Sequence, residues 1–204
     1  MIIAGGNKMK KLKFIFTFIL FVNILFCSTS CSSAEQKVQN KNTKPLVIYY
    51  SFTGNSQKIA EYAKQKLNAD ILKLEPKIPF STDYDAVVKE WQNNDIKRDV
   101  EIKPVNLDLT KYNKIVLITC VWWYGISPVM KKFLKEYDLS NKDIIVAASN
   151  AGWIGHSFKD YETLLPNSNI KAKLDLVFSS GDNNRHELKT TYKEIDDWLK
   201  GLGY

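Results

Sequence analysis

Five short apolar runs alternate with stretches of helical periodicity along most of this 204-residue chain. The runs cover residues 46–50, 70–74, 115–118, 144–148 and 174–178. Apolar strands that alternate with amphipathic helices are typical of a parallel sheet with helices on both faces. Because crossovers between parallel strands are right-handed, few topologies remain. The pattern predicts an α/β fold, a three-layer, doubly wound sheet of five parallel strands over residues 46–204.

Five helices are predicted between and after these strands. The first covers about 55–67, Asp83 has the residue type of an N-cap for the second, and Ser127 with Pro128 favours the start of the third. Each of the last four has an apolar face that is expected to be buried. These faces consist of Tyr84, Val87, Val88 and Trp91; Val129, Met130, Phe133, Leu134 and Tyr137; Phe158, Tyr161, Leu164 and Leu165; and Leu188, Tyr192, Ile195, Trp198, Leu199 and Leu202.

The first thirty residues have the composition of an export signal. A lysine-rich segment, 8–13, precedes a mostly apolar segment, 14–26, that is short for a membrane span. The small residues before Cys31 resemble the lipobox of a bacterial lipoprotein signal. We therefore predict a signal peptide over 1–30, a lipid on Cys31 and an extracytoplasmic, membrane-anchored protein. Ordinary secretion, an uncleaved anchor and modification of Cys27 are the alternatives.

Residues 31–45 are polar and show no apolar period, which predicts a flexible tether. The formal net charge of the chain is +7, but without the four lysines of the predicted signal peptide 25 basic residues face 22 acidic ones, a net charge of +3. No basic helix carries interleaved aromatic residues, so nucleic acid is not expected as a partner. Cys120 is the single cysteine of the predicted domain and is expected to be a buried apolar side chain. No catalytic side chain or metal ligand is assigned.

The loop after the first strand is rich in hydroxyl groups. It consists of Ser51, Phe52, Thr53, Gly54, Asn55 and Ser56, and it contains no lysine or arginine. At the start of a helix, backbone N–H groups lack partners and the helix dipole favours an anion. The hydroxyl groups add donors, and Gly54 lets the backbone approach a ligand closely. The loop is predicted to hold a phosphate, and a plain helix cap is the alternative.

Two further loops are expected to lie beside the first. Val121, Trp122, Trp123, Tyr124 and Gly125 follow the third strand, and Asn150, Ala151, Gly152 and Gly155 follow the fourth. In a sheet ordered 2-1-3-4-5, strands one, three and four are neighbours, so their loops meet at the carboxyl edge where such sheets bind ligands. Three consecutive aromatic residues cannot all face the core, which indicates a slot for a flat ring. Core packing of the aromatic residues and simple turn glycines are the alternatives, and His156 is interpreted as a helix-start residue.

These loops resemble those of the flavodoxin-like family. Residues 50–56 are similar to its FMN phosphate loop, a hydroxyl–x–Thr–Gly–x–Ser/Thr pattern. Trp123-Tyr124-Gly125 with Pro128, and Ser149-Asn150-Ala151-Gly152 with Gly155, resemble the second and third flavin loops of one bacterial, short-chain branch. Val121 replaces a usual proline, and Asn150-Ala151 replace a serine and a glycine. The resemblance covers about residues 46–204 and implies the strand order 2-1-3-4-5.

The resemblance implies non-covalent binding of FMN. Backbone N–H groups and the hydroxyl groups of Ser51, Thr53 and Ser56 would hold the phosphate. One of Trp122, Trp123 and Tyr124 would stack on the isoalloxazine, and the backbone of the second and third loops would meet the ring edge. The rim has few acidic residues and several cationic ones, Arg98, Lys131, Lys132 and Arg185. We therefore expect a less negative redox potential than that of an acidic flavodoxin.

The implied function is electron transfer by a carrier tethered outside the cytoplasm. Its partner would be a redox protein or a small-molecule acceptor, and it would meet the membrane through its lipid. An NAD(P)H-dependent FMN quinone-type oxidoreductase is one alternative, and a non-redox module that binds another phosphorylated ligand is the other. The scarcity of NAD(P)H outside the cytoplasm favours the carrier.

Overall fold

The computed structural model describes residues 44–93, 99–181 and 186–204. The predicted signal peptide, Cys31, Cys27 and most of the tether lie outside the described residues, as do Arg98 and Arg185. Within the described ranges, no helix is long and apolar enough to cross a membrane.

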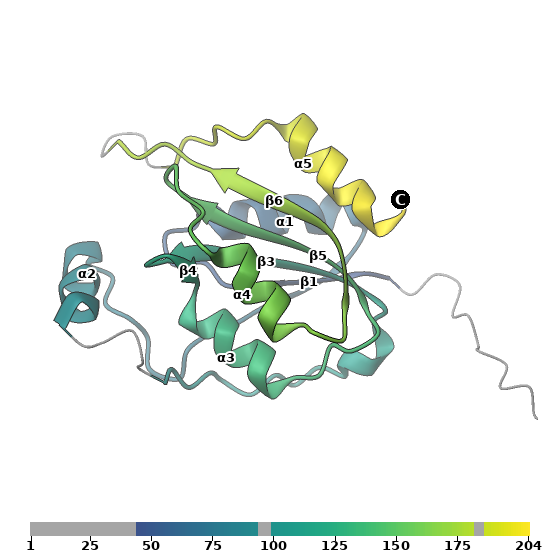
Figure 1. Ribbon diagram of the computed structural model, residues 1–204, viewed down its shortest axis with the longest axis horizontal. Coiled ribbons are helices and arrows are strands. Elements are labelled where there is room, and N and C mark those ends of the chain that lie inside the picture. Colours follow the sequence, from purple (N-terminus) through teal and green to yellow (C-terminus); the bar gives the residue numbers. More distant parts are fainter. Residues whose placement is uncertain (1–43, 94–98, 182–185) are drawn as a thin grey trace, which may run out of the picture. The chain divides into compact units, whose positions relative to one another are not determined.

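The predicted parallel sheet is confirmed (Figure 1). Its strands are β1 (Leu46–Tyr49), β2 (Asp70–Lys73), β3 (Lys114–Trp122), β5 (Asp143–Asn150) and β6 (Asn169–Val177), and the short β4 (Gly125–Ile126) pairs antiparallel with β3. The order β2-β1-β3-β5-β6 is the expected order 2-1-3-4-5 when β4 is left aside. β1 and β3 are neighbours, so the strand order reverses between them.

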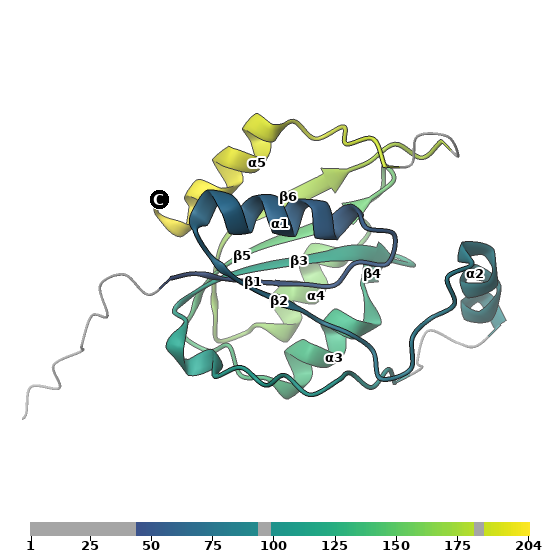
Figure 2. The ribbon, with the colours of Figure 1, turned by 180° about the vertical axis from the view of Figure 1, so that it is seen from behind.

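Alternate residues of the central strands β1, β3 and β5 enter two separate cores. Val47, Val116 and Ile145 pack with α1 (Asn55–Leu67) and α5 (Tyr192–Leu199). Leu46, Ile115 and Ile144 pack with α3 (Pro128–Glu136) and α4 (Ser157–Leu164). Figures 1 and 2 show these helix pairs on opposite faces of the sheet. Because both faces are covered, the middle parts of the central strands, such as Ile115–Ile118 and Ile144–Ala148, are continuous apolar runs, as the sequence indicates.

The helix α2 (Tyr84–Asn93) does not join either layer. It stands beyond the carboxyl ends of the strands (Figure 1). The predicted cap is confirmed, because Asp83 Oδ1 accepts from the N–H of Asp85 at 2.9 Å. The predicted apolar face is wrong at Tyr84, which is 51% exposed, whereas Trp91 is buried. Trp91 packs on Phe80 and on Trp122, the last residue of β3, and not on the helix-covered faces of the sheet.

Three boundaries differ from the prediction. β3 continues to Trp122 and turns back as β4, so residues 121–126 form a β-hairpin and not an open loop. β6 begins five residues earlier than expected, at Asn169. The last helix begins only after Thr191, whose capping box with Glu194 fixes its start. Leu188 lies before that cap and forms a β-bridge with Phe178. A 3₁₀ turn, Leu109–Lys111, precedes β3, and another, Lys200–Leu202, follows α5.

Candidate functional site

A cavity of about 280 Å³ lies at the carboxyl ends of the central strands, where the strand order reverses. Its volume is near the lower end of the range of about 300–1,000 Å³ that is typical of small-molecule sites. All three predicted loops contribute to it. Its lining consists of Phe52, Thr53, Asn55, Tyr84, Val87, Val88, Cys120, Val121, Trp122, Trp123, Ser149, Asn150, Ala151, Phe178, Ser179 and Ser180.

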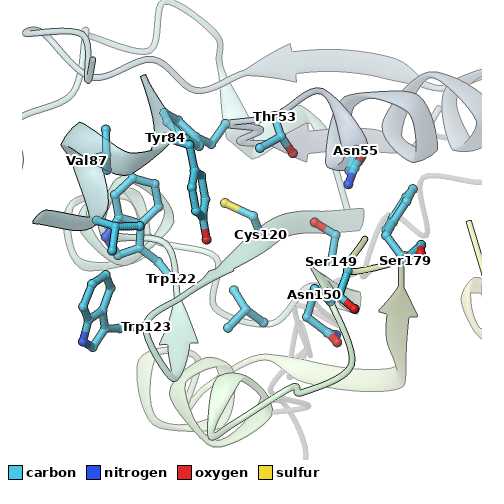
Figure 3. A pocket seen from close by; sticks show the side chains of 16 residues that line it. Thr53, Asn55, Tyr84, Val87, Cys120, Trp122, Trp123, Ser149, Asn150 and Ser179 are labelled. Carbon is cyan, nitrogen blue, oxygen red and sulfur yellow. The ribbon is translucent and has the colours of Figure 1, made fainter. Parts of the chain in front are cut away.

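The cavity has a polar side and an aromatic side (Figure 3). Thr53, Asn55, Ser149, Asn150 and Ser179 gather on one side of the view, and Tyr84, Val87, Trp122 and Trp123 on the other. Among the described residues, no lysine, arginine, aspartate or glutamate lines the cavity. The arrangement suits a molecule with a hydrogen-bonding end and a flat apolar end.

The polar side includes the start of α1. The N-cap is Gly54, with φ at 95°, a left-handed conformation that glycine adopts at little cost. Among the described residues, no side chain caps this helix, and its first turn contains no acidic residue. Ser51 Oγ accepts from the N–H of Gly54 at 3.1 Å, which closes the loop. The positive end of the helix dipole at this start therefore favours an anion.

The hydroxyl groups of the first loop have different surroundings. Thr53 lines the main cavity. Ser51 lines an adjoining hollow of about 520 Å³, which shares Thr53, Phe52 and Tyr84 with the main cavity. Ser56 is turned inward and is only 1% exposed. Its Oγ lies 2.8 Å from Ser149 Oγ, so this hydroxyl group joins α1 to the end of β5.

The aromatic residues of the second loop separate into three environments. Trp122 lies within a cluster of rings, 4.9 Å from Phe80 and 5.4 Å from both Phe52 and Trp91 between centroids. Trp123 lines the cavity with a left-handed backbone, φ 55°, in the two-residue turn between β3 and β4. A bulky residue in this conformation costs about 1–3 kcal/mol, and such strain is often found at functional sites.

Tyr124 lies on the outer surface of the rim. It is 49% exposed, and its ring centroid lies 4.7 Å from that of Trp153, which is also exposed. Neither residue lines the cavity. Of the three predicted stacking candidates, the structure therefore places Trp122 and Trp123 at the cavity and Tyr124 outside it.

Gly125 and Gly155 connect the second and third loops. A Cβ on Gly125 would lie 2.2 Å from Asp160 Oδ2, and one on Gly155 would lie 2.1 Å from the carbonyl oxygen of Tyr124. The same carbonyl accepts from the N–H of His156 at 2.6 Å. Both glycines permit a close approach of backbone and side chains, and neither lines the cavity. The glycines of the second and third loop motifs are therefore explained by close packing between the two loops.

Asp160 holds this junction together. Its Oδ2 accepts from the N–H of Ile126 at 3.0 Å and lies 3.1 Å from Lys131 Nζ. Its Oδ1 lies 2.9 Å from Nδ1 of His156, which is the N-cap residue of α4. His156 is therefore a helix-start residue, as the sequence indicates. Lys131, which the sequence predicts to lie near the rim, is thus paired with Asp160.

The third loop is shaped by Asn150. Its Oδ1 accepts from the N–H of Gly152 at 2.8 Å, and its Nδ2 donates to Asp175 at 2.5 Å. Gly152 has φ 111°, and a Cβ there would have open space, so only its backbone conformation favours glycine. Asn150 and Ala151 line the cavity, whereas Gly152 does not.

Several lining residues are absent from the sequence-based set. Tyr84, Val87 and Val88 come from α2, which the sequence placed on the sheet. Ser149 belongs to the third-loop motif but is not among the predicted cofactor-binding residues, and Ser179 and Ser180 follow β6. The signal that could have identified these serines is their position after a strand end, the same signal that identified the first loop.

Cys120 also lines the cavity. Burial raises the pKa of the Cys120 thiol to about 12, so the group is protonated at neutral pH. A protonated thiol is a poor nucleophile, and Cys120 therefore acts as a small apolar wall element.

Comparisons with known proteins agree with this architecture. The family model described as Flavodoxin matches residues 44–195. A flavoprotein structure from Bacteroides eggerthii aligns over 80% of this chain and 99% of its own, with a TM-score of 0.63 and 23% identity. One from Bacteroides uniformis aligns over 78% and 99%, with a TM-score of 0.62 and 18% identity.

A third structure, a flavoprotein from Lactobacillus acidophilus in complex with FMN, covers 77% of this chain and 99% of its own, with a TM-score of 0.55 and 20% identity. No curated protein is significantly similar to the chain. The structural likenesses support the fold, and the family model covers most of the chain. The chain belongs to the flavodoxin family.

Proposed function

We propose that the cavity binds FMN and that the protein transfers electrons through this cofactor. The observation that carries the proposal is the division of one cavity into a polar side at an uncapped helix start and an aromatic side (Figure 3). FMN has a phosphate at one end and a flat tricyclic ring at the other. The Lactobacillus acidophilus flavoprotein of the same fold is a complex with FMN. The bound flavin would supply the redox chemistry, and the protein would bind, orient and shield it.

The phosphate would be held by the amides at the start of α1 together with Thr53 and Ser51. Dipoles and hydroxyl groups suffice for this where water is partly excluded. Ser56 would contribute its backbone, because its hydroxyl group is bonded to Ser149.

The ring would lie on the aromatic side. Trp122 already has Phe80, Phe52 and Trp91 packed around it. We therefore assign Trp123 as the stacking residue of the second loop. Tyr84 and Val87 of α2 would form a further wall that limits the access of water to the ring.

The uncharged lining bears on the redox potential. Carboxylates beside a flavin disfavour the anionic reduced form, and among the described residues none lines this cavity. Lys131 and Lys132 do not add free positive charge, since they pair with Asp160 and with Asp99 and Glu136. We propose a potential less negative than that of flavodoxins with an acidic rim, to be measured by redox titration of the FMN-loaded protein.

A lipid on Cys31 would attach the protein to the membrane through its N-terminal segment. The tether would enter the domain at Lys44, beside the start of β1, where Lys44 Nζ lies 2.7 Å from Asp70 Oδ1. The cavity lies at the opposite, carboxyl ends of the strands. A partner outside the cytoplasm would meet the flavin at this end of the domain. Loss of membrane attachment and of palmitate labelling in Cys31→Ser would support a lipid on Cys31, and unchanged labelling would exclude it.

The cofactor proposal is tested by titration of the purified full-length protein with FMN. Quenching of flavin fluorescence and a resolved visible absorbance band are the expected results. Protein that remains colourless with excess FMN would contradict the proposal. Anaerobic addition of NADH or NADPH to the loaded protein then separates the two redox roles. A carrier retains its oxidised spectrum until dithionite is added, whereas an NAD(P)H-dependent enzyme bleaches at once.

A further inference from the structure

The segment after β6 brings His186 to the first loop. Phe178 and Leu188 form a β-bridge, and the N–H of Ser179 donates to the carbonyl of Glu187 at 2.8 Å. The N–H of Lys189 donates to the carbonyl of Val177 at 2.8 Å. These antiparallel contacts fix the backbone on the C-terminal side of His186.

His186 contacts the first residue of α1. Its Nδ1 lies 2.8 Å from Oδ1 of Asn55, which is 131 positions earlier in the chain. An amide oxygen only accepts, so the Nδ1–H of His186 donates in this bond. His186 also lines the adjoining hollow together with Ser51 and Thr53. The imidazole therefore faces the same space as two hydroxyl groups of the proposed phosphate loop.

The carboxylates near His186 are paired with lysine side chains. Glu75 and Lys73 line the same hollow, and Glu75 is paired with Lys103 at 3.1 Å and lies 3.9 Å from Lys73. Glu187 is paired with Lys189 at 2.8 Å. The nearby carboxylates thus have lysine partners of their own, and the main cavity has no cationic lining residue among those described.

We propose that His186 is a recognition residue for the phosphate of the flavin. The inference rests on the proposed function and adds a specificity determinant to it. With Nδ1–H donating to Asn55, the ring can donate a second bond from Nε2 only as the imidazolium ion. That cation would supply the positive charge that the first loop lacks. It would favour FMN, which carries a phosphate, over riboflavin, which does not.

The test compares the dissociation constants of FMN and riboflavin for the full-length protein by fluorescence quenching. His186→Ala should weaken FMN binding about fivefold to tenfold, because a charge-assisted hydrogen bond is lost at an exposed position. Riboflavin binding should change less than twofold. His186→Arg, which keeps a cation, should retain the preference for FMN. Lys159→Ala, an exposed position on α4 that lines neither the cavity nor the adjoining hollow, is the control and should bind both ligands as the wild type does.

The outcomes separate the two proposals. If the wild type binds neither flavin, the proposed function fails. If the wild type binds FMN and His186→Ala binds it equally well, the role of His186 is overturned while the function stands. An equal loss of FMN and riboflavin in His186→Ala would show that the side chain only supports the loop, which also overturns phosphate recognition.

Discussion

The Oγ atoms of Ser56 and Ser149 lie 2.8 Å apart in a buried hydrogen bond, although 93 positions separate them in the chain. One residue belongs to the first turn of α1 and the other to the end of β5. The bond thus joins the start of the proposed phosphate site to the strand that leads into the third loop. Each hydroxyl group also gives the other a partner in a region where water is largely excluded.

Ser56→Ala is expected to act on stability more than on ligand binding. It leaves the Ser149 hydroxyl without its partner, which costs about 1–3 kcal/mol in the free energy of unfolding. Urea denaturation measures this loss. The double variant Ser56→Ala/Ser149→Ala should lose less than the sum of the single variants. A large loss of FMN affinity at unchanged stability would show instead that the hydroxyl group turns to the phosphate.

Thr53→Ala is expected to show the opposite behaviour. Thr53 lines the cavity, and its hydroxyl group is proposed to bond the phosphate. Loss of one bond to a charged group should weaken FMN binding about tenfold. The free energy of unfolding of the protein without FMN should change by less than about 0.5 kcal/mol. Thr163→Ala, an exposed position on α4, is the control. Equal FMN affinity in Thr53→Ala and the wild type would contradict the assignment.

Gly125→Ala is expected to destabilise the junction of the second and third loops. The added Cβ would meet Asp160 Oδ2 at 2.2 Å, and overpacking of this kind costs about 1–3 kcal/mol. Chemical denaturation without FMN isolates the effect from ligand binding. Because Asp160→Ala removes the obstructing carboxylate, the double variant should be more stable than the two separate losses predict. Strict additivity would mean that the clash is relieved elsewhere.

Helix starts that are set by neighbouring residues could be predicted from the sequence. The start of α1 follows from Gly54 after an apolar strand, and the start of α3 follows from Ser127 and Pro128, which the structure confirms. The convergence of three loops also follows from the order of the strands. The position of α2 does not, since Trp91 packs on Phe80 and on Trp122 at the very end of β3, and not on a helix-covered face of the sheet.

The directions of single side chains could not be predicted from the sequence pattern, because contacts with residues distant in the chain determine them. Ser56 and Thr53 are both hydroxyl residues of one loop, and only the distant Ser149 decides that Ser56 turns inward. Gly125 has the sequence context of a ligand-binding glycine, but Asp160 of α4 occupies the space that a Cβ on Gly125 would need. His186 reaches Asn55 through pairing that no local period encodes.

Lys142 gives the protein a pH dependence far from the cavity. Its Nζ donates to the carbonyls of Leu109 and Tyr112 at 3.0 and 2.7 Å, and burial lowers the pKa of this lysine. The folded state then loses the proton at a lower pH than the unfolded state. Between these two pKa values the unfolded state binds more protons, so stability gains a positive contribution as pH rises.

The measurement for Lys142 is the free energy of unfolding between pH 8 and the ordinary lysine pKa of about 10.4. The wild type should gain stability relative to Lys142→Met over this interval, because the variant lacks the titrating group. Parallel curves for the two proteins would show that burial of the ammonium has no consequence for folding.

Trp123 has a strained backbone conformation and is also the proposed stacking residue. Two substitutions can separate the effects of strain and of stacking. Alanine normally stabilises a folded chain relative to glycine, but at φ 55° glycine is favoured because it lacks a Cβ. Trp123→Gly should therefore be more stable than Trp123→Ala by about 1 kcal/mol without FMN. Both variants should lose the same FMN affinity, about tenfold, because each removes the aromatic wall. Thermal unfolding and FMN titration of the two variants provide the comparison. If the alanine variant is the more stable one, the turn is not strained at Trp123. If both variants bind FMN as the wild type does, another ring stacks on the flavin.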